Sequence, residues 1–285
     1  PKPVVVATAT ATATGVATAK PVAPAPCPAV VVSPFVVPVG GDDPAVPRIT
    51  RAARLKPFFE RAAAVLRGVA TDHVRIAVYG DSNLTMDFQT GQMRRQLQKR
   101  YGDAGHGFVA LAKPWSHYRH QNVQHGVLAG FASYAITTKP IFDSMYGIAG
   151  ITAESMQPGA KVFVETAKSG SPIGSQVEQV ELFYLLRAKG GSFQVVVDGK
   201  PAEEVSTLAK TAEATQHGAV GRHVVKLTDG AHRVTLVAKQ TLRRVRFFGA
   251  ALERPSSKKS FIVDAFGIGS LNSRAHSMGT DHIKA

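Results

Sequence analysis

Prolines crowd the first fifty residues of the chain, and this crowding limits how much of the sequence can fold. Ten of the 17 prolines fall within residues 1–50, in a stretch that otherwise consists mainly of Val, Ala and Thr. Proline removes backbone donors and keeps the chain extended, and such a composition buries too little surface to offset the entropy of ordering. We therefore expect residues 1–48 to be a disordered linker, which leaves about 235 residues for folded domains.

The chain is strongly basic, and its composition excludes disulfide-linked folds, cysteine-rich metal sites and membrane-spanning helices. The 34 Lys and Arg against 20 Asp and Glu give a formal net charge of +14. With Cys27 as the single cysteine, neither an intrachain disulfide nor a cysteine-rich metal site is possible. No run of about 18 consecutive apolar residues is present, so no transmembrane helix is predicted.

The residues after the linker predict the start of an α/β sheet. Residues 49–66 form an amphipathic helix pattern that ends at Gly68, with an apolar face of Leu55, Phe58, Phe59, Ala62, Ala63 and Leu66. The apolar run of residues 74–79 predicts a buried strand that ends at Gly80. Residues 87–101 then predict a helix whose inward side chains are Met93, Leu97 and Tyr101.

Further along, the pattern changes to short alternating segments separated by Gly-rich turns. This period-two alternation predicts an antiparallel β-sandwich, with strands at residues 161–167, 176–188, 191–199, 223–230, 232–239 and 244–253. Residues 261–268, FIVDAFGI, return to a continuous apolar run. This run predicts a second parallel strand of the first sheet.

The sharpest chemical feature is the turn Gly80-Asp81-Ser82-Asn83, which follows the first predicted strand and precedes a helix. Open α/β sheets place their sites at the carboxyl ends of strands. The amino end of the following helix would favour negative charge developing on a substrate oxygen. Ser82 is therefore a candidate nucleophile, although a three-residue match alone also fits an ordinary turn serine.

The longer string VRIAVYGDSNLTMDFQTGQMRRQLQKRYGDAGHGFV resembles the first conserved block of the SGNH, or GDSL-type, hydrolases. It looks most like the branch that contains bacterial peptidoglycan O-acetylesterases. ELFYLLRAKGGSFQVVVDGK and the segments after it are similar to the carbohydrate-binding-like sandwich that this branch carries inside its hydrolase domain. FIVDAFGIGSLNSRA resembles the second block, and the resemblance covers residues 50 to 276.

This resemblance implies a role for each residue of the turn. Ser82 would be the nucleophile, and its backbone N–H would be the first donor of the oxyanion hole. Asp81 would support the turn, and Asn83 stands where this branch often has His. The second block would supply another N–H, from Gly269 or Ser270; we favour Gly269, although the local order departs from the family's Gly-x-Asn-Gly.

A serine nucleophile needs a histidine base, which this superfamily takes from a late Asp-x-x-His motif. The two strings with that spacing, Asp103 to His106 and Asp229 to His232, lie in a loop and in a predicted hairpin turn, so we expect both to be decoys. The adjacent pair Asp281-His282 lacks the spacer. No asparagine follows a third strand either, since the chain holds only Asn83, Asn122 and Asn272.

The expected organisation follows from these matches. It comprises the linker 1–48, the first part of a Rossmann-like three-layer hydrolase domain at 49–115, an inserted jelly-roll-like sandwich at 116–255, and an incomplete second part at 256–285. Only about 95 residues remain for a hydrolase domain that needs more than two strands. The chain is therefore expected to stop before its catalytic Asp and His, and to be inactive alone.

Four histidines, His106, His117, His120 and His125, fall within twenty residues and invite comparison with a metal site. Because this stretch is predicted to be loop, we expect surface or cleft histidines, with no metal and no cofactor. Trp115 is expected near the junction of the domains, where it either packs or stacks on a sugar.

The predicted function is a serine esterase that removes O-acetyl groups from peptidoglycan or another acetylated polysaccharide. The alternative is a non-catalytic glycan-binding or envelope protein with a degenerate hydrolase half. The basic residues are dispersed, with short runs such as Arg243-Arg244 and Lys258-Lys259, which argues against specific nucleic-acid binding and suits non-specific attraction to anionic envelope polymers. The spacer fits an extracytoplasmic location, in the periplasm or cell envelope.

Overall fold

The computed structural model describes residues 52–239 and 242–270. The predicted linker 1–48, Cys27, Asn272 and the Asp281-His282 pair lie outside these residues. Among the helices described, none is both long enough and apolar enough to cross a membrane.

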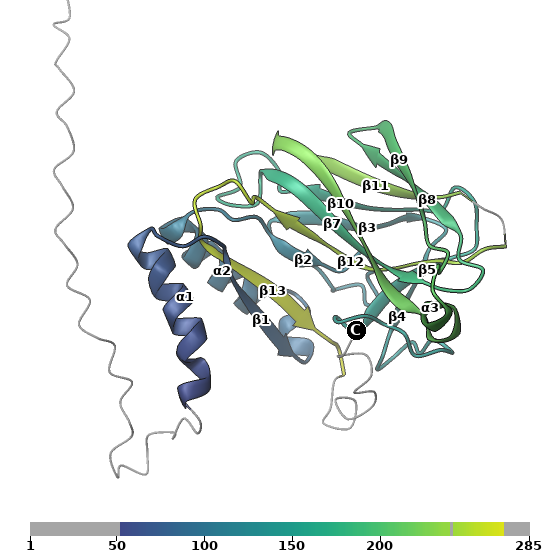
Figure 1. Ribbon diagram of the computed structural model, residues 1–285, viewed down its shortest axis with the longest axis horizontal. Helices are drawn as coiled ribbons and strands as arrows, with labels where there is room; N and C mark the ends of the chain where they lie inside the picture. The colour runs from purple at the N-terminus through teal and green to yellow at the C-terminus, as the bar shows by residue number, and fades with distance from the viewer. Residues whose placement is uncertain (1–51, 240–241, 271–285) are drawn as a thin grey trace, which may run out of the picture. The chain divides into compact units, whose positions relative to one another are not determined.

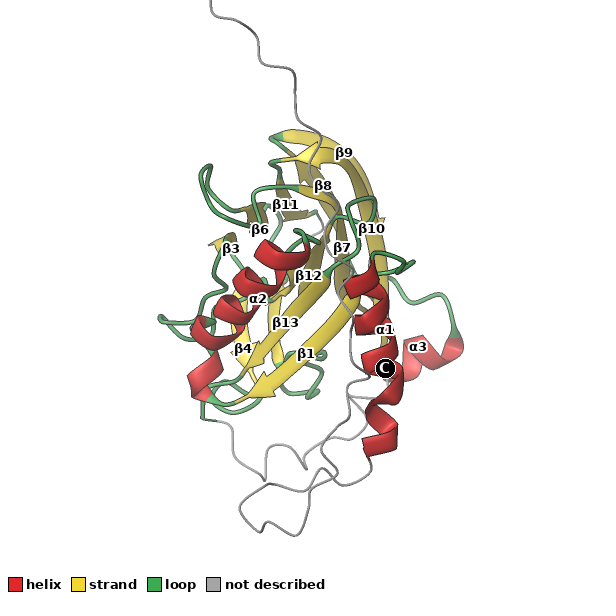
Figure 2. Ribbon diagram, turned by 90° about the vertical axis from the view of Figure 1, so that its left-hand side faces the viewer, coloured by secondary structure: helices red, strands yellow, loops and turns green. Residues whose placement is uncertain are grey.

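A two-stranded parallel sheet occupies one part of the fold. Strands β1 (Val74–Gly80) and β13 (Phe261–Gly267) pair in parallel from Val74 opposite Phe261 to Gly80 opposite Gly267. Helices α1 (Lys56–Arg67) and α2 (Phe88–Tyr101) lie on the same face of this pair, α1 along β1 and α2 along β13 (Figures 1 and 2). This confirms the predicted parallel strand pair. The Rossmann-like three-layer domain as a whole stays a prediction.

Helix α1 forms where the sequence predicts it, but its apolar face is not inward as expected. A short 3-10 helix, Ala52–Leu55, precedes it, and Gly68 ends it with φ of 71°. Of its side chains only Val65 is buried, while Phe58 and Leu66 are 36% and 51% exposed. Val65 packs with Val74 of β1 and Phe261 of β13 in a small cluster, against which Ala62 is partly buried.

The burial of β1 and α2 also differs from the prediction. Strand β1 alternates rather than being buried throughout, because its other face, which includes Arg75 and Tyr79, stays exposed. In α2 the buried side chains are polar and belong to Thr90, Arg94 and Gln98, whereas Leu97 is only partly buried. Hydrogen bonds to the backbone of β13 explain this inversion, since its carbonyl groups accept from Nε and Nη2 of Arg94 and from Nε2 of Gln98.

The larger part of the fold is an antiparallel sandwich, as predicted. One sheet has the order β10-β7-β12-β5-β4, with β2 paired to β12, and the other has the order β3-β6-β11-β8-β9. The strands are β2 (Gly107–Val109), β3 (Val123–Ala129), β4 (Ala132–Ala135), β5 (Ile151–Ser155), β6 (Lys161–Thr166), β7 (Val177–Leu186), β8 (Ser192–Val197), β9 (Lys200–Ser206), β10 (Ala219–Gly230), β11 (Arg233–Ala238) and β12 (Val245–Glu253). The short helix α3 (Ala212–His217) precedes β10.

The sandwich core lies between the inward faces of its two sheets. Phe193 of β8 meets Phe247 of β12 edge to face, with ring centroids 4.9 Å apart. Leu182 and Leu236 come from opposite sheets and are fully buried in the same cluster. Alternation of inward apolar and outward polar residues thus produces this core, which is the arrangement expected for packed antiparallel sheets.

Strand β13 joins the parallel pair to the sandwich. Phe266 packs against Phe108 of β2, with ring centroids 5.2 Å apart. The N–H of Phe108 donates to Oδ1 of Asp264 across 2.7 Å, and Arg75 pairs with the same carboxylate at 3.1 Å. Burial raises the pKa of Asp264 despite the nearby Arg75 guanidinium. These contacts pack β13 against β2 of the sandwich.

Candidate active site

Ser82 lies two residues after Gly80, the carboxyl end of β1, and is exposed. It opens a 3-10 turn, η2 (Ser82–Leu84), which Asp81 caps by accepting hydrogen bonds from the N–H and the side-chain Nδ2 of Asn83, both at 2.9 Å. Thr85 Oγ1 donates to the Ser82 carbonyl at 2.7 Å. The turn is thus fixed around Ser82, whose hydroxyl bonds to no group in the described part of the chain.

The turn after β13 leaves the sheet beside Ser82. The N–H of Ile268 donates to the carbonyl of Gly80 across 3.0 Å, which extends the parallel pairing to the ends of both strands. A methyl group on Gly267 would lie 2.5 Å from the carbonyl carbon of Leu84 and 2.7 Å from the backbone nitrogen of Thr85. The β13 turn therefore packs against the backbone of η2, and only glycine fits at Gly267.

Gly269, the favoured second oxyanion donor, is buried beneath Trp115. A methyl group on Gly269 would lie 2.9 Å from Cε2 of the indole, and Thr137 Oγ1 donates to the Gly269 carbonyl. Trp115 therefore packs on Gly269 but is only partly buried, so stacking on a sugar stays a prediction. Ser270, the other candidate, is exposed with φ of 60°. Within the described residues the N–H groups of Ser82 and Gly269 donate to no protein acceptor, and Gly269 itself is buried.

A buried ion pair between Asp87 and Arg94 lies next to the turn that carries Ser82. Asp87 is 1% exposed, has φ of 55°, and accepts from Nη1 of Arg94 at 2.9 Å and from the N–H of Gln121 at 2.8 Å. Arg94 also donates to the carbonyl of Val263 in β13. Although burial alone would raise it, the pKa of Asp87 is lowered, chiefly by the Arg94 charge. Sequence reasoning missed Arg94, because its partner Asp87 precedes the helix as the N-cap residue of α2 and its other partner, the Val263 carbonyl, lies in β13.

Three of the four clustered histidines are buried, which contradicts the prediction of surface or cleft residues. His106, His120 and His125 are 2%, 4% and 3% exposed, and only His117 is exposed. They lie in the core because His106 adjoins β2 and His125 lies within β3, so this stretch is not all surface loop. Nε2 of His120 accepts from the N–H of Ala110, and Nε2 of His125 accepts from the N–H of His120.

Burial favours the neutral form of these three histidines. Burial, followed by the charge of Arg94, lowers the pKa of His106 well below its ordinary value. Burial lowers the pKa of His120 to about 4, against the opposing attraction of Asp87. Burial also lowers the pKa of His125 well below its ordinary value. Neutral rings are the form that a low-dielectric core accepts at least cost.

Asp87, His106 and His120 each present one potential ligand atom within 4.8 Å of the other two. Both oxygens of Asp87, however, already accept hydrogen bonds from Arg94, Gln121 and Thr90. A cation bound there would lie beside the Arg94 guanidinium, whose side chain is 0% exposed. Because a buried like charge is unfavourable, this donor set does not suit a divalent ion.

Neither described Asp-x-x-His string forms an Asp–His pair. Asp103 accepts from the N–H groups of Gly105 and Gly174, both at 2.9 Å, and His106 is buried in the cluster. Asp229 pairs with Arg254, and His232 bonds instead to Asp198 at 2.7 Å. In the described residues, no histidine is hydrogen-bonded to Ser82.

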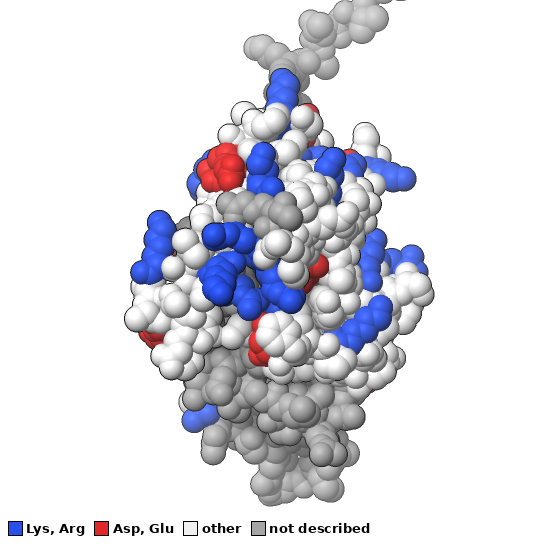
Figure 3. Space-filling view, turned by 90° about the vertical axis from the view of Figure 1, so that its right-hand side faces the viewer, with Lys and Arg blue, Asp and Glu red and all other residues white. Residues whose placement is uncertain are grey.

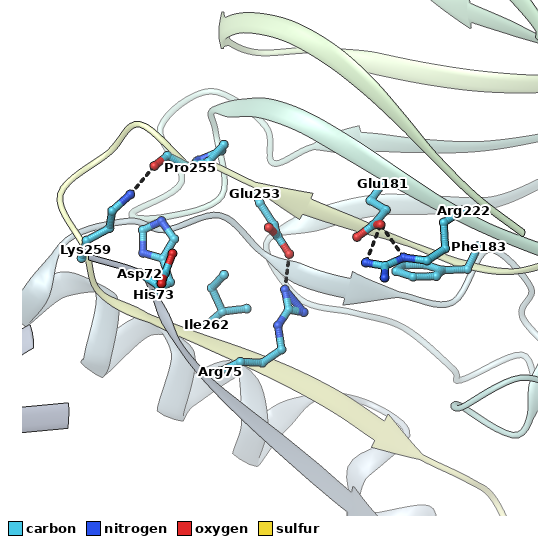
Figure 4. Close-up of a pocket in the computed structure, with 10 residues that line it drawn as sticks. All are labelled: Asp72, His73, Arg75, Glu181, Phe183, Arg222, Glu253, Pro255, Lys259 and Ile262. Atoms are coloured by element: carbon cyan, nitrogen blue, oxygen red, sulfur yellow. Dashed lines mark hydrogen bonds and ion pairs between the residues drawn. The ribbon is translucent and has the colours of Figure 1, made fainter. Parts of the chain in front are cut away.

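A cavity of about 480 Å³ lies at the opposite, amino end of β1 (Figure 4). Its charged side chains pair among themselves: Arg75 with Glu253, and Arg222 with Glu181 at 2.7 Å. Lys259 points to the carbonyl of a nearby proline. Because Ser82 follows the carboxyl end of the strand, this cavity does not contain the candidate nucleophile.

Comparison with solved structures finds similarity to a peptidoglycan O-acetylesterase. The two chains are 25% identical with a TM-score of 0.55, and the match covers 78% of this chain and 54% of the other. The chain thus spans about half the length of that enzyme. No protein-family model matches the sequence, and no curated protein matches it.

Two further solved structures are similar at a lower level. One is a family two carbohydrate esterase from Cellvibrio japonicus, 11% identical with a TM-score of 0.32 over 55% of this chain and 35% of the other. The second is a two-domain esterase active on acetylated mannans, 13% identical with a TM-score of 0.34 over 52% and 36%. The structural neighbours thus include carbohydrate esterases.

Proposed function

We propose that this protein is a serine esterase of the SGNH type that removes O-acetyl groups from a polysaccharide, with peptidoglycan as the favoured substrate. The observation that carries the proposal is the in-register ending of β1 and β13, which brings an exposed serine and a glycine turn to one edge of a sheet. Similarity in fold to a peptidoglycan O-acetylesterase supports it.

The proposed reaction begins when Oγ of Ser82 attacks the acetyl carbonyl carbon while a histidine base takes the hydroxyl proton. The N–H groups of Ser82 and Gly269 would donate to the developing oxyanion. Collapse of the tetrahedral intermediate expels the sugar oxygen, which takes the proton, and leaves acetyl on Ser82. Water then attacks the acetyl-serine, releasing acetate and restoring the hydroxyl. The resemblance assigns the base to a late Asp-x-x-His pair.

The alternative is a glycan-binding protein whose hydrolase half is not catalytic. The observation that favours it is the unpaired Ser82 hydroxyl, which has no histidine partner among the described residues. An extracytoplasmic location, in the periplasm or cell envelope, would suit both functions.

Turnover of a chromogenic acetyl ester by the natural protein separates the two functions. Esterase function predicts that Ser82→Ala lowers kcat by at least about a thousandfold, because the nucleophile is lost. The matched control is Ser169→Ala, an exposed serine in a sandwich loop, which should leave kcat unchanged. Absence of turnover by the wild type would reject the esterase and leave the glycan-binding function, whereas equal turnover of Ser82→Ala and wild type would reject Ser82 as the nucleophile.

A further inference from the structure

A second cavity, of about 370 Å³, opens on the sandwich at the edge strand β4. Its lining joins β4, the end of β5 and the start of β12, and comprises Gly130, Ala132, Tyr134, Glu154, Ser155, Met156, Gln157 and Arg244. Tyr134 is partly exposed and Met156 is 38% exposed. The cavity thus offers an aromatic ring and an apolar side chain beside polar groups, the usual composition of a site for a small polar ligand.

Beneath this cavity, three arginines share two carboxylates. Arg246 is 1% exposed and donates to both oxygens of Asp143, at 2.6 and 2.9 Å, and to Glu154. Arg244 pairs with the other oxygen of Glu154. Arg187 lies 3.8 Å from Asp143 and 3.7 Å from Glu154, and its buried Nη1 makes no hydrogen bond in the described residues. The cluster therefore carries an excess positive charge.

Further cations surround this cluster at the surface. Lys189 and Arg243 are exposed, and they are held near Arg244 because Gly190 bridges to Arg244 and Gly191 packs against Arg243. Figure 3 shows Lys and Arg side chains gathered around a hollow in the middle of one face of the molecule, with Asp and Glu atoms at the margin of the group. Such a field attracts and retains anions.

Arg244 is the cation best placed to contact a ligand in the cavity. Its side chain is 39% exposed, and its guanidinium lies 5.4 Å from the ring centroid of Phe142, which is itself 74% exposed. Arg244 uses Nη1 to donate to Glu154. Arg246 also donates to Glu154, so the charge of this carboxylate is already balanced without Arg244. Arginine presents several donors in a planar fork, so it can also bind a carboxylate ligand in two-point fashion.

The cavity and the Ser82 site are connected by one strand pair. At the cavity, Ala132 of β4 lies opposite Glu154 of β5. Three residues further along β4, about 10 Å from Ala132, Ala135 lies opposite Ile151 of β5. The loop between these strands reaches the β13 turn, because Thr137 bonds to the carbonyl of Gly269. A polymer held in the cavity could therefore extend toward Ser82 along this loop.

We infer that this cavity binds the carboxylate of an acidic sugar residue in the polysaccharide, with the sugar ring against Tyr134 and the carboxylate on Arg244. The inference rests on the proposed function for its substrate and narrows that substrate to a carboxylate-bearing glycan. Binding at the cavity needs no chemistry at Ser82, so the two proposals can fail separately.

Calorimetric titration of the protein with a uronic-acid oligosaccharide, and with the same oligosaccharide after carboxyl reduction, tests this inference. Binding of the acidic form should be at least about tenfold tighter at physiological salt, because the charged hydrogen bonds to Arg244 are then formed. Arg244→Gln should remove most of that difference. Arg222→Gln, which removes an exposed arginine elsewhere on the sandwich, should change the affinity less than about twofold.

Two additional variants separate binding at the cavity from misfolding of Arg244→Gln and from chemistry at Ser82. Tyr134→Ala removes no charge and should weaken both oligosaccharides alike, so it tests the cavity even if Arg244→Gln fails to fold. Ser82→Ala should bind as wild type does, whether or not the protein is an esterase. Equal affinity for the two oligosaccharides, equal losses in Arg244→Gln and Arg222→Gln, or equally tight binding of dextran sulfate would each overturn the inference.

Discussion

Arg94 donates a hydrogen bond to Asp87 across 2.9 Å, and each of the two side chains is at most 1% exposed. The pair ties three segments together: the turn that carries Ser82, strand β13 through the Val263 carbonyl, and the loop before β3 through the N–H of Gln121. A buried ion pair of this kind contributes little net stability by itself, but loss of one partner leaves an uncompensated charge.

Asp87→Asn should destabilise the protein by about 3–5 kcal/mol, because Arg94 then stays buried without its counter-charge. Asparagine tolerates the positive φ of this position, so the change tests charge rather than backbone conformation. Urea denaturation measures the loss. Asp229→Asn, which breaks an exposed pair with Arg254, is the control and should cost at most about 1 kcal/mol. Equal losses would contradict a special role for the buried pair.

Stability should fall as the pH drops below about 6.5, the ordinary histidine value. The pKa values of His106, His120 and His125 are lowered in the folded state, so the unfolded chain binds protons first. The three histidines make their full contribution to the free energy of unfolding above that pH. This contribution is lost as the pH falls toward about 4, where His120 titrates. Each histidine adds up to about 1.4 kcal/mol per pH unit to the slope of the free energy of unfolding against pH.

Urea midpoints measured between about pH 7.5 and pH 5 check this slope. His120→Gln should make the dependence shallower, because one linked proton is removed. His217→Gln is the matched control, since His217 is exposed at the end of α3. A stability that does not change over this pH range would show that the three rings are not buried neutral.

Gly267→Ala should destabilise the protein by about 1–3 kcal/mol, because the added methyl group meets the backbone of Leu84 and Thr85. Any esterase activity should fall with it, since the two turns of the candidate site would separate. Gly230→Ala is the control, because the nearest contact of a methyl group there is 3.7 Å away. Thermal melting compares the two variants, and indistinguishable melting temperatures would contradict the close packing of the β13 turn on η2.

Added Zn²⁺ should leave the melting temperature unchanged, because a cation bound to Asp87 would lie beside the buried Arg94 guanidinium. A thermal shift titration with zinc chloride measures this directly. Stabilisation by Zn²⁺ that disappears in both His106→Ala and His120→Ala would contradict this reasoning and identify a metal site at the cluster.

Alternating strands were predictable because each has one face in the sandwich core and one in solvent. All six predicted sandwich segments form strands, and residues 261–267 form the predicted parallel strand. β5, ITAES, was missed because all five residues are buried and no alternation marks it. β9, KPAEEVS, was missed because it is an exposed, charged strand that contains a proline.

The environment of the candidate site was less predictable than its position. A strand followed by Gly-Asp-Ser locates Ser82 at the carboxyl edge of β1, as expected. Hydrophobic periodicity, however, assigns charged and polar residues to the surface, so it could not foresee buried Arg94 or His120. Their burial depends on partners distant in sequence, such as the Val263 carbonyl, which only the folded chain brings near.

The central claim is that Ser82 is the nucleophile, and covalent labelling tests it most directly. A fluorophosphonate, which reacts with activated serines, should modify the natural protein at Ser82, as located by peptide mass spectrometry. Labelling should be lost in Ser82→Ala and retained in Ser169→Ala. An active esterase that is labelled at another serine, or that keeps its activity in Ser82→Ala, would contradict the claim.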